Sequence, residues 1–140
     1  MSPSAPELVT ADGLGRWQII QPRRGYRFSI DSVLLAFFAP LPSGPVTDLG
    51  AGCGVLCLLL AARGLVGPFT AIEIDPLAAD CCRDNLARHR LDGRTFNQDL
   101  AAPIPELPAA SQSLVISNPP FGKPGQGRVP PDPARARARH

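Results

Sequence analysis

The spacing of hydrophobic positions along the chain changes several times, and each change predicts a different element. Residues 46–49, 69–74 and 114–117 are short runs of mostly apolar or β-branched side chains, typical of buried strands. Longer apolar segments that follow a capping residue and end at glycine or proline indicate helices. The expected order is helix 30–39, strand 46–49, helix 55–63, strand 69–74, helix 77–90, a weaker strand 94–97 and strand 114–117. Asp75 and Pro76 are expected to start the third helix, as N-cap and first helical residue.

Strands that alternate with helices predict an α/β fold, with about four parallel strands covered by helices on both faces. Residues 1–16 show no such pattern and are expected to be a loose terminus. No periodic segment follows Asn118. The expected organisation is a flexible N-terminus over 1–17, one domain over 18–121, and a tail rich in proline and arginine, or the start of a continuation, over 122–140.

Composition narrows the class of protein. A chain of 140 residues suits about one domain. Its longest unbroken apolar run, 55–62, is far shorter than the ~20 residues of a membrane helix. No leader pattern is visible at the N-terminus. We therefore expect a cytoplasmic protein with no membrane partner.

The net charge of +2 conceals an uneven distribution. Five basic residues, among them Lys123 and Arg128, stand against a single acid in the last 19 positions. A second basic cluster contains Arg23, Arg24 and Arg27. Two basic patches could meet a polyanion such as a nucleic acid, or they could be solvated surface.

The four cysteines indicate reduced thiols rather than a metal site. They form no C-x-x-C pair and have no histidine at a ligand spacing, so no metal is expected. They are Cys53, Cys57, Cys81 and Cys82.

A glycine-rich loop joins the first strand to the next helix. Its pattern, G-x-G-x-G, is neither the nicotinamide fingerprint nor a phosphate-binding P-loop. The acid Asp48 near the strand's end would repel a pyrophosphate and suits a ligand that carries an ammonium or sulfonium group. The candidate cofactor-binding residues here are Asp48, Gly50, Ala51, Gly52 and Gly54.

Two further acids follow later strands. Glu73 lies 23 residues after Gly50, where such folds place a carboxylate on ribose hydroxyls. Asp99 could accept a hydrogen bond from a purine amine, or it could be a turn residue. Both are candidate cofactor contacts, because ligands bind at the carboxyl ends of parallel strands.

The last strand runs into Asn118-Pro119-Pro120-Phe121. The two prolines stiffen the backbone and carry no N–H, which leaves carbonyls and the Asn118 side chain as acceptors. Such a site can hold a planar NH₂ group and favour a pyramidal nitrogen whose lone pair is exposed for attack. Phe121 can stack on a flat group such as a base. A plain proline-rich turn is the competing interpretation.

These residues resemble the class I S-adenosylmethionine-dependent methyltransferases. Residues 48–54 look like their first motif, Glu73 like their ribose acid and Asp99 like their adenine contact. Residues 118–121 look like the motif of enzymes that methylate exocyclic or amide nitrogen. The stretch 21–35 and the region after Phe121 resemble the bacterial tRNA1(Val) adenine-N6 methyltransferase family.

The resemblance implies a Rossmann-like sheet, S-adenosyl-L-methionine as cofactor and tRNA as partner. It also implies that Asn118, Pro119, Pro120 and Phe121 are catalytic and that the two basic patches contact RNA phosphates. The superfamily's sheet has seven strands in the order 3-2-1-4-5-7-6, and only four are visible here. Either the chain continues, or a partner chain covers the fourth strand.

Two other functions stay open at this stage. A protein-glutamine N5 methyltransferase of release-factor type uses the same Asn-Pro-Pro chemistry. A non-catalytic remnant that needs a partner would retain the motifs without activity.

Overall fold

A parallel sheet of four strands forms the centre of the computed structural model, which describes residues 8–25 and 27–119. Strands β3 (Val46–Leu49) and β4 (Phe69–Glu73) lie in the middle. Strands β5 (Gly93–Asn97) and β6 (Leu114–Ser117) lie at the two edges, in the order β5-β4-β3-β6. The parallel α/β architecture and its four strands are therefore confirmed, and the order is third, second, first, fourth.

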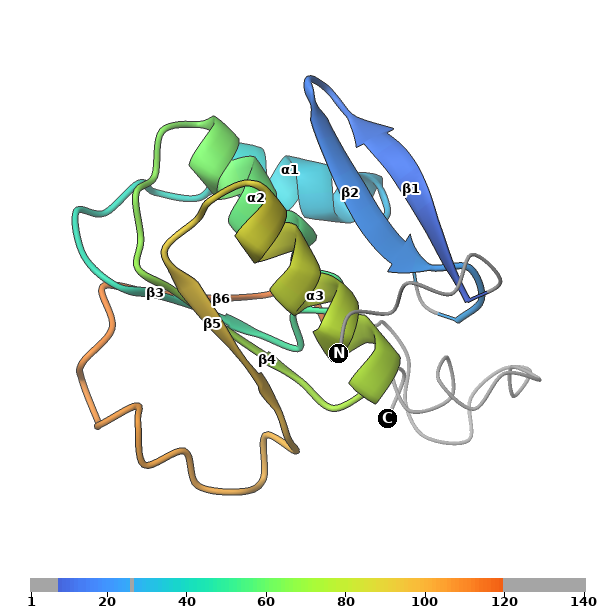
Figure 1. Cartoon of the computed structure of the whole chain (residues 1–140). Helices are drawn as coiled ribbons and strands as arrows, with labels where there is room; N and C mark the ends of the chain where they lie inside the picture. Colours follow the sequence, from blue (N-terminus) through green and yellow to red (C-terminus); the bar gives the residue numbers. More distant parts are fainter. Residues whose placement is uncertain (1–7, 26, 120–140) are drawn as a thin grey trace.

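Three helices pack on one face of this sheet (Figure 1). They are α1 (Ile30–Phe38), α2 (Val55–Ala62) and α3 (Pro76–Arg88). The start of α3 follows the predicted rule, because the Asp75 carboxylate accepts the Ala78 N–H at 3.1 Å and proline occupies the first turn. The predicted helix ends, at 39, 63 and 90, are one or two residues too late.

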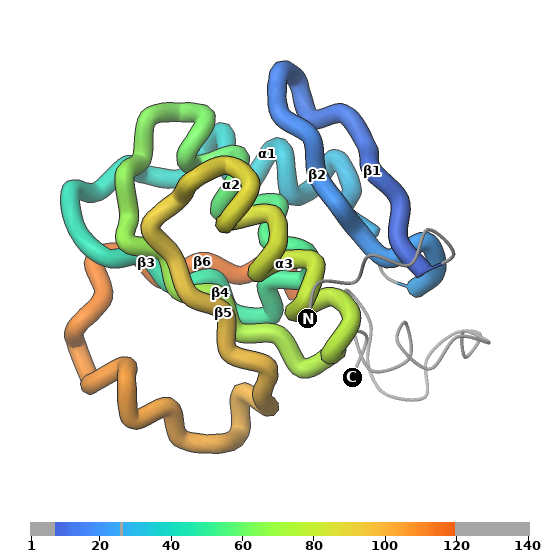
Figure 2. The backbone as a smooth tube through the Cα atoms, viewed as in Figure 1, coloured from blue at the N-terminus to red at the C-terminus, as the bar shows by residue number. Residues whose placement is uncertain are grey.

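The expectation of helices on both faces was wrong for the described residues. The β3–β4 and β4–β5 connections step across the sheet in the same direction, and right-handed crossovers therefore place α2 and α3 on the same face. The chain then returns from β5 to β6 through residues 98–113, which form no helix. Figure 2 shows this long connection on the side of the sheet away from the helices.

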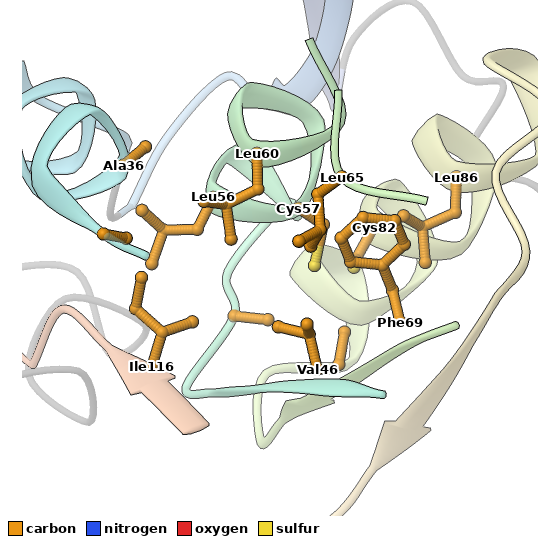
Figure 3. Close-up of a cluster of buried hydrophobic side chains, with 13 residues drawn as sticks. Ala36, Val46, Leu56, Cys57, Leu60, Leu65, Phe69, Cys82, Leu86 and Ile116 are labelled. Atoms are coloured by element: carbon orange, nitrogen blue, oxygen red, sulfur yellow. The ribbon is translucent and has the colours of Figure 1, made fainter. Parts of the chain in front are cut away.

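The main core lies between the sheet and the helices (Figure 3). Val46, Phe69 and Ile116 point up from the strands toward the helices. Ile116 lies below Leu56 of α2, and Phe69 lies beside Cys82 and Leu86 of α3. Each such side chain contributes about 1.5–3 kcal/mol when it is fully buried. This core holds the carboxyl ends of β3 and β6 side by side.

An antiparallel hairpin precedes the sheet, formed by β1 (Val9–Leu14) and β2 (Trp17–Pro22). The expected loose terminus over 1–16 was therefore wrong from Val9 onward. Ile19 and Ile20 pack with Leu58 of α2 and Cys81 of α3 in a second core. The hairpin depends on these distant contacts, which its own short and irregular pattern does not reveal.

The described residues contain no helix long and apolar enough to cross a membrane. At the sheet edge, β6 pairs only with β3 among the described strands, and its Val115 side chain is 55% exposed. The fourth strand is thus an open edge in this part of the chain.

Candidate functional site

A pocket lies at the carboxyl ends of β3 and β6, beside the start of α1. Parallel pairing of these two strands brings the glycine loop and Asn118 to the same edge of the sheet. The pocket is lined by Phe28, Ser32, Asp48, Gly50, Ala51, Gly52, Cys53, Val55, Leu56 and Asn118. The structure therefore brings the two main sequence motifs together in one place.

The glycine loop needs its glycines for two different reasons. Gly50, Gly52 and Gly54 all have left-handed backbone angles, with φ of 69°, 58° and 87°. At Gly54 there is also no space, because a Cβ atom would lie 2.8 Å from the Cys82 Sγ. The loop is thus packed directly against α3 as it enters α2.

Glu73 ties this loop to the next one. Its Oε2 accepts the Gly52 N–H at 2.6 Å and its Oε1 accepts the Asp75 N–H at 2.9 Å. The carboxylate stands at the end of β4, as predicted, but it is not among the residues that line the pocket. In this structure Glu73 therefore fixes the shape of the loop.

Asp48 is the unusual group of the pocket. Its side chain is buried, and neither carboxylate oxygen has a hydrogen-bond partner among the described residues. Burial, with a smaller contribution from Glu73, raises the pKa of Asp48 well above its ordinary value. An unsatisfied buried acceptor in a pocket wall is suited to a ligand that brings a cationic donor.

Asn118 is held by a residue of α1. Its Nδ2 donates to the Ser32 Oγ at 2.9 Å, and Ser32 is only 2% exposed. The preceding residue, Ser117, is the last of β6, and its hydroxyl donates to the Leu49 carbonyl at 2.8 Å. This hydrogen bond ties the carboxyl end of β6 to that of β3. Pro119 is described and exposed, whereas Pro120 and Phe121 lie outside the described residues.

Among the pocket residues that lie outside the glycine loop and the start of α2, the sequence reasoning missed Phe28 and Ser32. Both lie inside the stretch 21–35 that carries the family resemblance, and this was the available signal. Neither belongs to a catalytic motif on its own.

Asp99 lies apart from the pocket lining. It follows β5, is exposed, and its Oδ1 accepts the Ala101 N–H at 2.9 Å. This geometry is that of a turn residue. The expected contact of Asp99 with adenine stays a prediction.

The basic residues that were predicted to contact RNA have different surroundings. Arg27 donates to the Asp12 carboxylate at 2.9 Å and to the Pro22 carbonyl at 3.1 Å, so it fastens the hairpin. Hydrogen bonds from Gln21 and Thr10, together with Arg27, lower the pKa of Asp12. Arg23 and Arg24 are exposed beside the hairpin. Lys123 and Arg128 lie outside the described residues.

The four cysteines are free and buried. Burial raises the pKa of Cys81 and Cys82 to about 12, which keeps both as thiols at neutral pH. In the described ranges no three His, Cys, Asp or Glu side chains are placed to hold a metal ion.

Comparisons with known proteins agree with this geometry. A tRNA1(Val) (adenine(37)-N6)-methyltransferase of Shewanella amazonensis is 39% identical over 118 residues, which cover 83% of this chain and 49% of the relative. The protein of the same name from Porphyromonas gingivalis is 35% identical over 134 residues, with 89% and 52% covered. The chain thus spans about half the length of these curated relatives.

Solved structures show the same fold. A T. thermophilus 16S rRNA N2 methyltransferase, solved with AdoMet and guanosine, superposes with a TM-score of 0.65 at 24% identity, over 98% of this chain and 38% of that one. A Pyrococcus abyssi tRNA (uracil-54, C5)-methyltransferase gives 0.51 at 16% identity, over 63% and 23%. The family model of the methyltransferase small domain matches residues 30–129, so the chain belongs to the methyltransferase small domain family.

Proposed function

We propose that this chain transfers a methyl group from S-adenosyl-L-methionine to the exocyclic N6 of an adenine in tRNA. The observation that carries the proposal is the meeting of the buried, unsatisfied Asp48 carboxylate and the Asn118 amide in one pocket. The similarity to the two tRNA1(Val) (adenine(37)-N6)-methyltransferases supports adenine-N6 of tRNA as the target. Such a protein would work in the cytoplasm, where tRNA is found.

The cofactor side of the pocket would be formed by the glycine loop. Asp48 would accept hydrogen bonds from the cofactor's ammonium group, which would also satisfy its buried oxygens. Gly50, Ala51 and Gly52 bring backbone rather than side chains to the ligand. Glu73 would use its remaining lone pairs on ribose hydroxyls, and Asp99 would move to meet the adenine amine.

On the substrate side, Asn118 would hold the target amine. The Ser32 hydroxyl accepts from Nδ2, so the Oδ1 of Asn118 would be left to accept an N–H of the base. The Pro119 carbonyl would accept the second N–H. Pro120 would stiffen this turn and Phe121 would stack on the ring.

The cofactor would supply a methyl group on a positively charged sulfur. With both N–H groups held by acceptors, the amine lone pair would be free to attack that methyl carbon, the N–C bond forming as the S–C bond breaks. The amine would then lose one proton to water. No strong base is required, which fits a pocket whose lining contains no histidine or lysine among the described residues.

RNA would be held by the two basic patches of the sequence. The target adenine has to be splayed out of its loop to reach a pocket of this kind. Arg23, Arg24, Lys123 and Arg128 would contact phosphates. Arg27 would act mainly by holding the hairpin that carries its neighbours.

The edge of β6 would need a further strand in the working enzyme. We propose that a segment outside these 140 residues supplies it, since the relatives are about twice as long as the matched region. The exposed apolar side chains of α1 beside this edge, Ile30, Phe37 and Phe38, would be covered at the same time. Fragment complementation with the remaining half of the S. amazonensis relative tests this, and a stable dimer of the chain alone would contradict it.

The test of function is a competition between two substrates. The chain, with and without the complementing half, is incubated with labelled S-adenosylmethionine and either total tRNA or a release factor. Label in tRNA adenine supports the proposal. Label in the release factor identifies a protein-glutamine methyltransferase, and no label with no cofactor binding identifies a non-catalytic remnant.

A further inference from the structure

The side chain of Asn85 connects its own helix to two other parts of the fold that are far from it in the sequence. It lies on α3 and is fully buried. Its Nδ2 donates to the Ile20 carbonyl at 2.7 Å and to the Cys53 carbonyl at 2.8 Å. Its Oδ1 accepts the Ile20 N–H at 2.8 Å. One amide thus joins α3, the hairpin and the glycine loop, and both of its N–H groups are used.

The contact with Ile20 completes the free edge of the hairpin. One edge of β2 pairs with β1, where Ile20 stands opposite Ala11. On the other edge the N–H and C=O of Ile20 both meet the Asn85 amide, which takes the place of a third strand. Because buried backbone groups require partners, the hairpin docks most favourably where this amide meets it.

The contact with Cys53 reaches the pocket itself. Cys53 is part of the pocket lining, between Gly52, whose N–H is held by Glu73, and Gly54, which is packed against Cys82. The carbonyl that Asn85 holds is therefore a third fixed point of the loop. This third contact depends on Asn85, which is also hydrogen-bonded to the hairpin.

We propose that Asn85 is a positioning residue of the cofactor site, and that it makes the geometry of the glycine loop depend on the docked hairpin. This inference rests on the proposed function, which makes the pocket a cofactor site. When the hairpin leaves, the Asn85 amide loses two of its three partners and is free to rotate away from the Cys53 carbonyl. Conditions that undock the hairpin therefore also weaken cofactor binding.

The first test compares two neighbouring buried positions of α3. Asn85→Ala removes the amide, and Leu86→Ala is the control because Leu86 is 2% exposed and packs in the main core rather than in the second core that holds the hairpin. Amide hydrogen exchange of the full chain is measured segment by segment. Asn85→Ala should speed exchange in both 17–22 and 50–54 about fivefold or more. Leu86→Ala should leave these two segments within about twofold.

The second readout is the affinity for S-adenosylhomocysteine, measured by calorimetry at a temperature where both variants are folded. Asn85→Ala should weaken binding about fivefold to tenfold. Leu86→Ala should change it by less than about twofold. Equal effects of the two variants, or unchanged exchange in 50–54 for Asn85→Ala, would overturn the inference. If the wild-type chain binds no S-adenosylhomocysteine, the proposed function fails, while the exchange data still decide the coupling.

A third variant keeps the inference testable if Asn85→Ala does not fold. Ile19→Ala removes a fully buried side chain of the hairpin and leaves Asn85 in place. It should speed exchange in 50–54 as well as in the hairpin, but not in 93–97. Faster exchange confined to the hairpin would contradict the coupling.

Discussion

The close packing of the glycine loop on α3 can be tested by adding a single methyl group. In Gly54→Ala the new Cβ would lie 2.8 Å from the Cys82 Sγ and 3.6 Å from the Cys82 Cα. Cys82 is fully buried and its Sγ is 3.6 Å from the Thr95 hydroxyl, so the sulfur has little room to move. The left-handed backbone adds a cost of roughly 1–2 kcal/mol and the overpacking a further ~1–3 kcal/mol. We expect a total loss of about 2–5 kcal/mol in the free energy of unfolding.

Two further variants separate these contributions. Gly52→Ala has a similar positive φ but no atom within 4 Å of its Cβ, so it should lose only the backbone share of about 1–2 kcal/mol. Adding Cys82→Ala to Gly54→Ala should restore at least ~1 kcal/mol relative to additivity. Urea unfolding followed by circular dichroism gives all the values. The packing argument is refuted if Gly54→Ala costs no more than Gly52→Ala, or if the double variant is additive.

Three other predictions concern the pocket and the basic patch. Because burial raises the pKa of Asp48, the folded state keeps that proton to higher pH than the unfolded state does, and the free energy of unfolding falls as pH rises above about 4. In urea unfolding at several pH values, Asp48→Asn should remove this fall in the free energy of unfolding, and an unchanged fall would contradict the burial argument. The same variant should also weaken S-adenosylhomocysteine binding. Ser32→Ala frees the Asn118 amide and should lower kcat about tenfold with little change in the KM for cofactor, while a pure KM effect would place Ser32 elsewhere in the reaction. Arg24→Ala should weaken tRNA binding and reduce its salt dependence by about one phosphate contact, while Arg27→Ala should mainly lower the hairpin's stability. Titration of each variant with tRNA at several salt concentrations separates the two effects. Equal slopes of log affinity against log salt concentration for the two variants would refute the assignment of Arg24 to a phosphate contact.

The elements with strong local signals were predictable from the sequence. The limits of β6 were predicted to the residue, and α3 begins where Asp75 and Pro76 place it. Local rules were sufficient here because capping, proline placement and β-branched runs act within a few residues. The glycine loop and Asn118 each follow a parallel strand, and such strands end at one edge of the sheet, where the structure brings the two together.

What the sequence did not reveal depends on contacts between distant residues. The hairpin is held by Asn85, which lies 65 positions after Ile20, and no local pattern announces that contact. The same is true of Ser32, which reaches Asn118 across 86 positions. Arg27 was predicted as a phosphate contact, and its ion pair with the Asp12 carboxylate of the hairpin was not foreseen. Pairings of this kind follow from the tertiary arrangement and leave no periodic signal.

The most direct test of the central claim is methyl transfer by the wild-type chain and by Asn118→Ala, with the complementing half present and cofactor binding measured in parallel. The account predicts label on the N6 of tRNA adenine for the wild type. For Asn118→Ala it predicts a loss of about a hundredfold or more in the transfer rate, with the affinity for S-adenosylhomocysteine unchanged. Transfer that survives in Asn118→Ala, or cofactor binding that is lost together with transfer, would contradict the role assigned to this pocket.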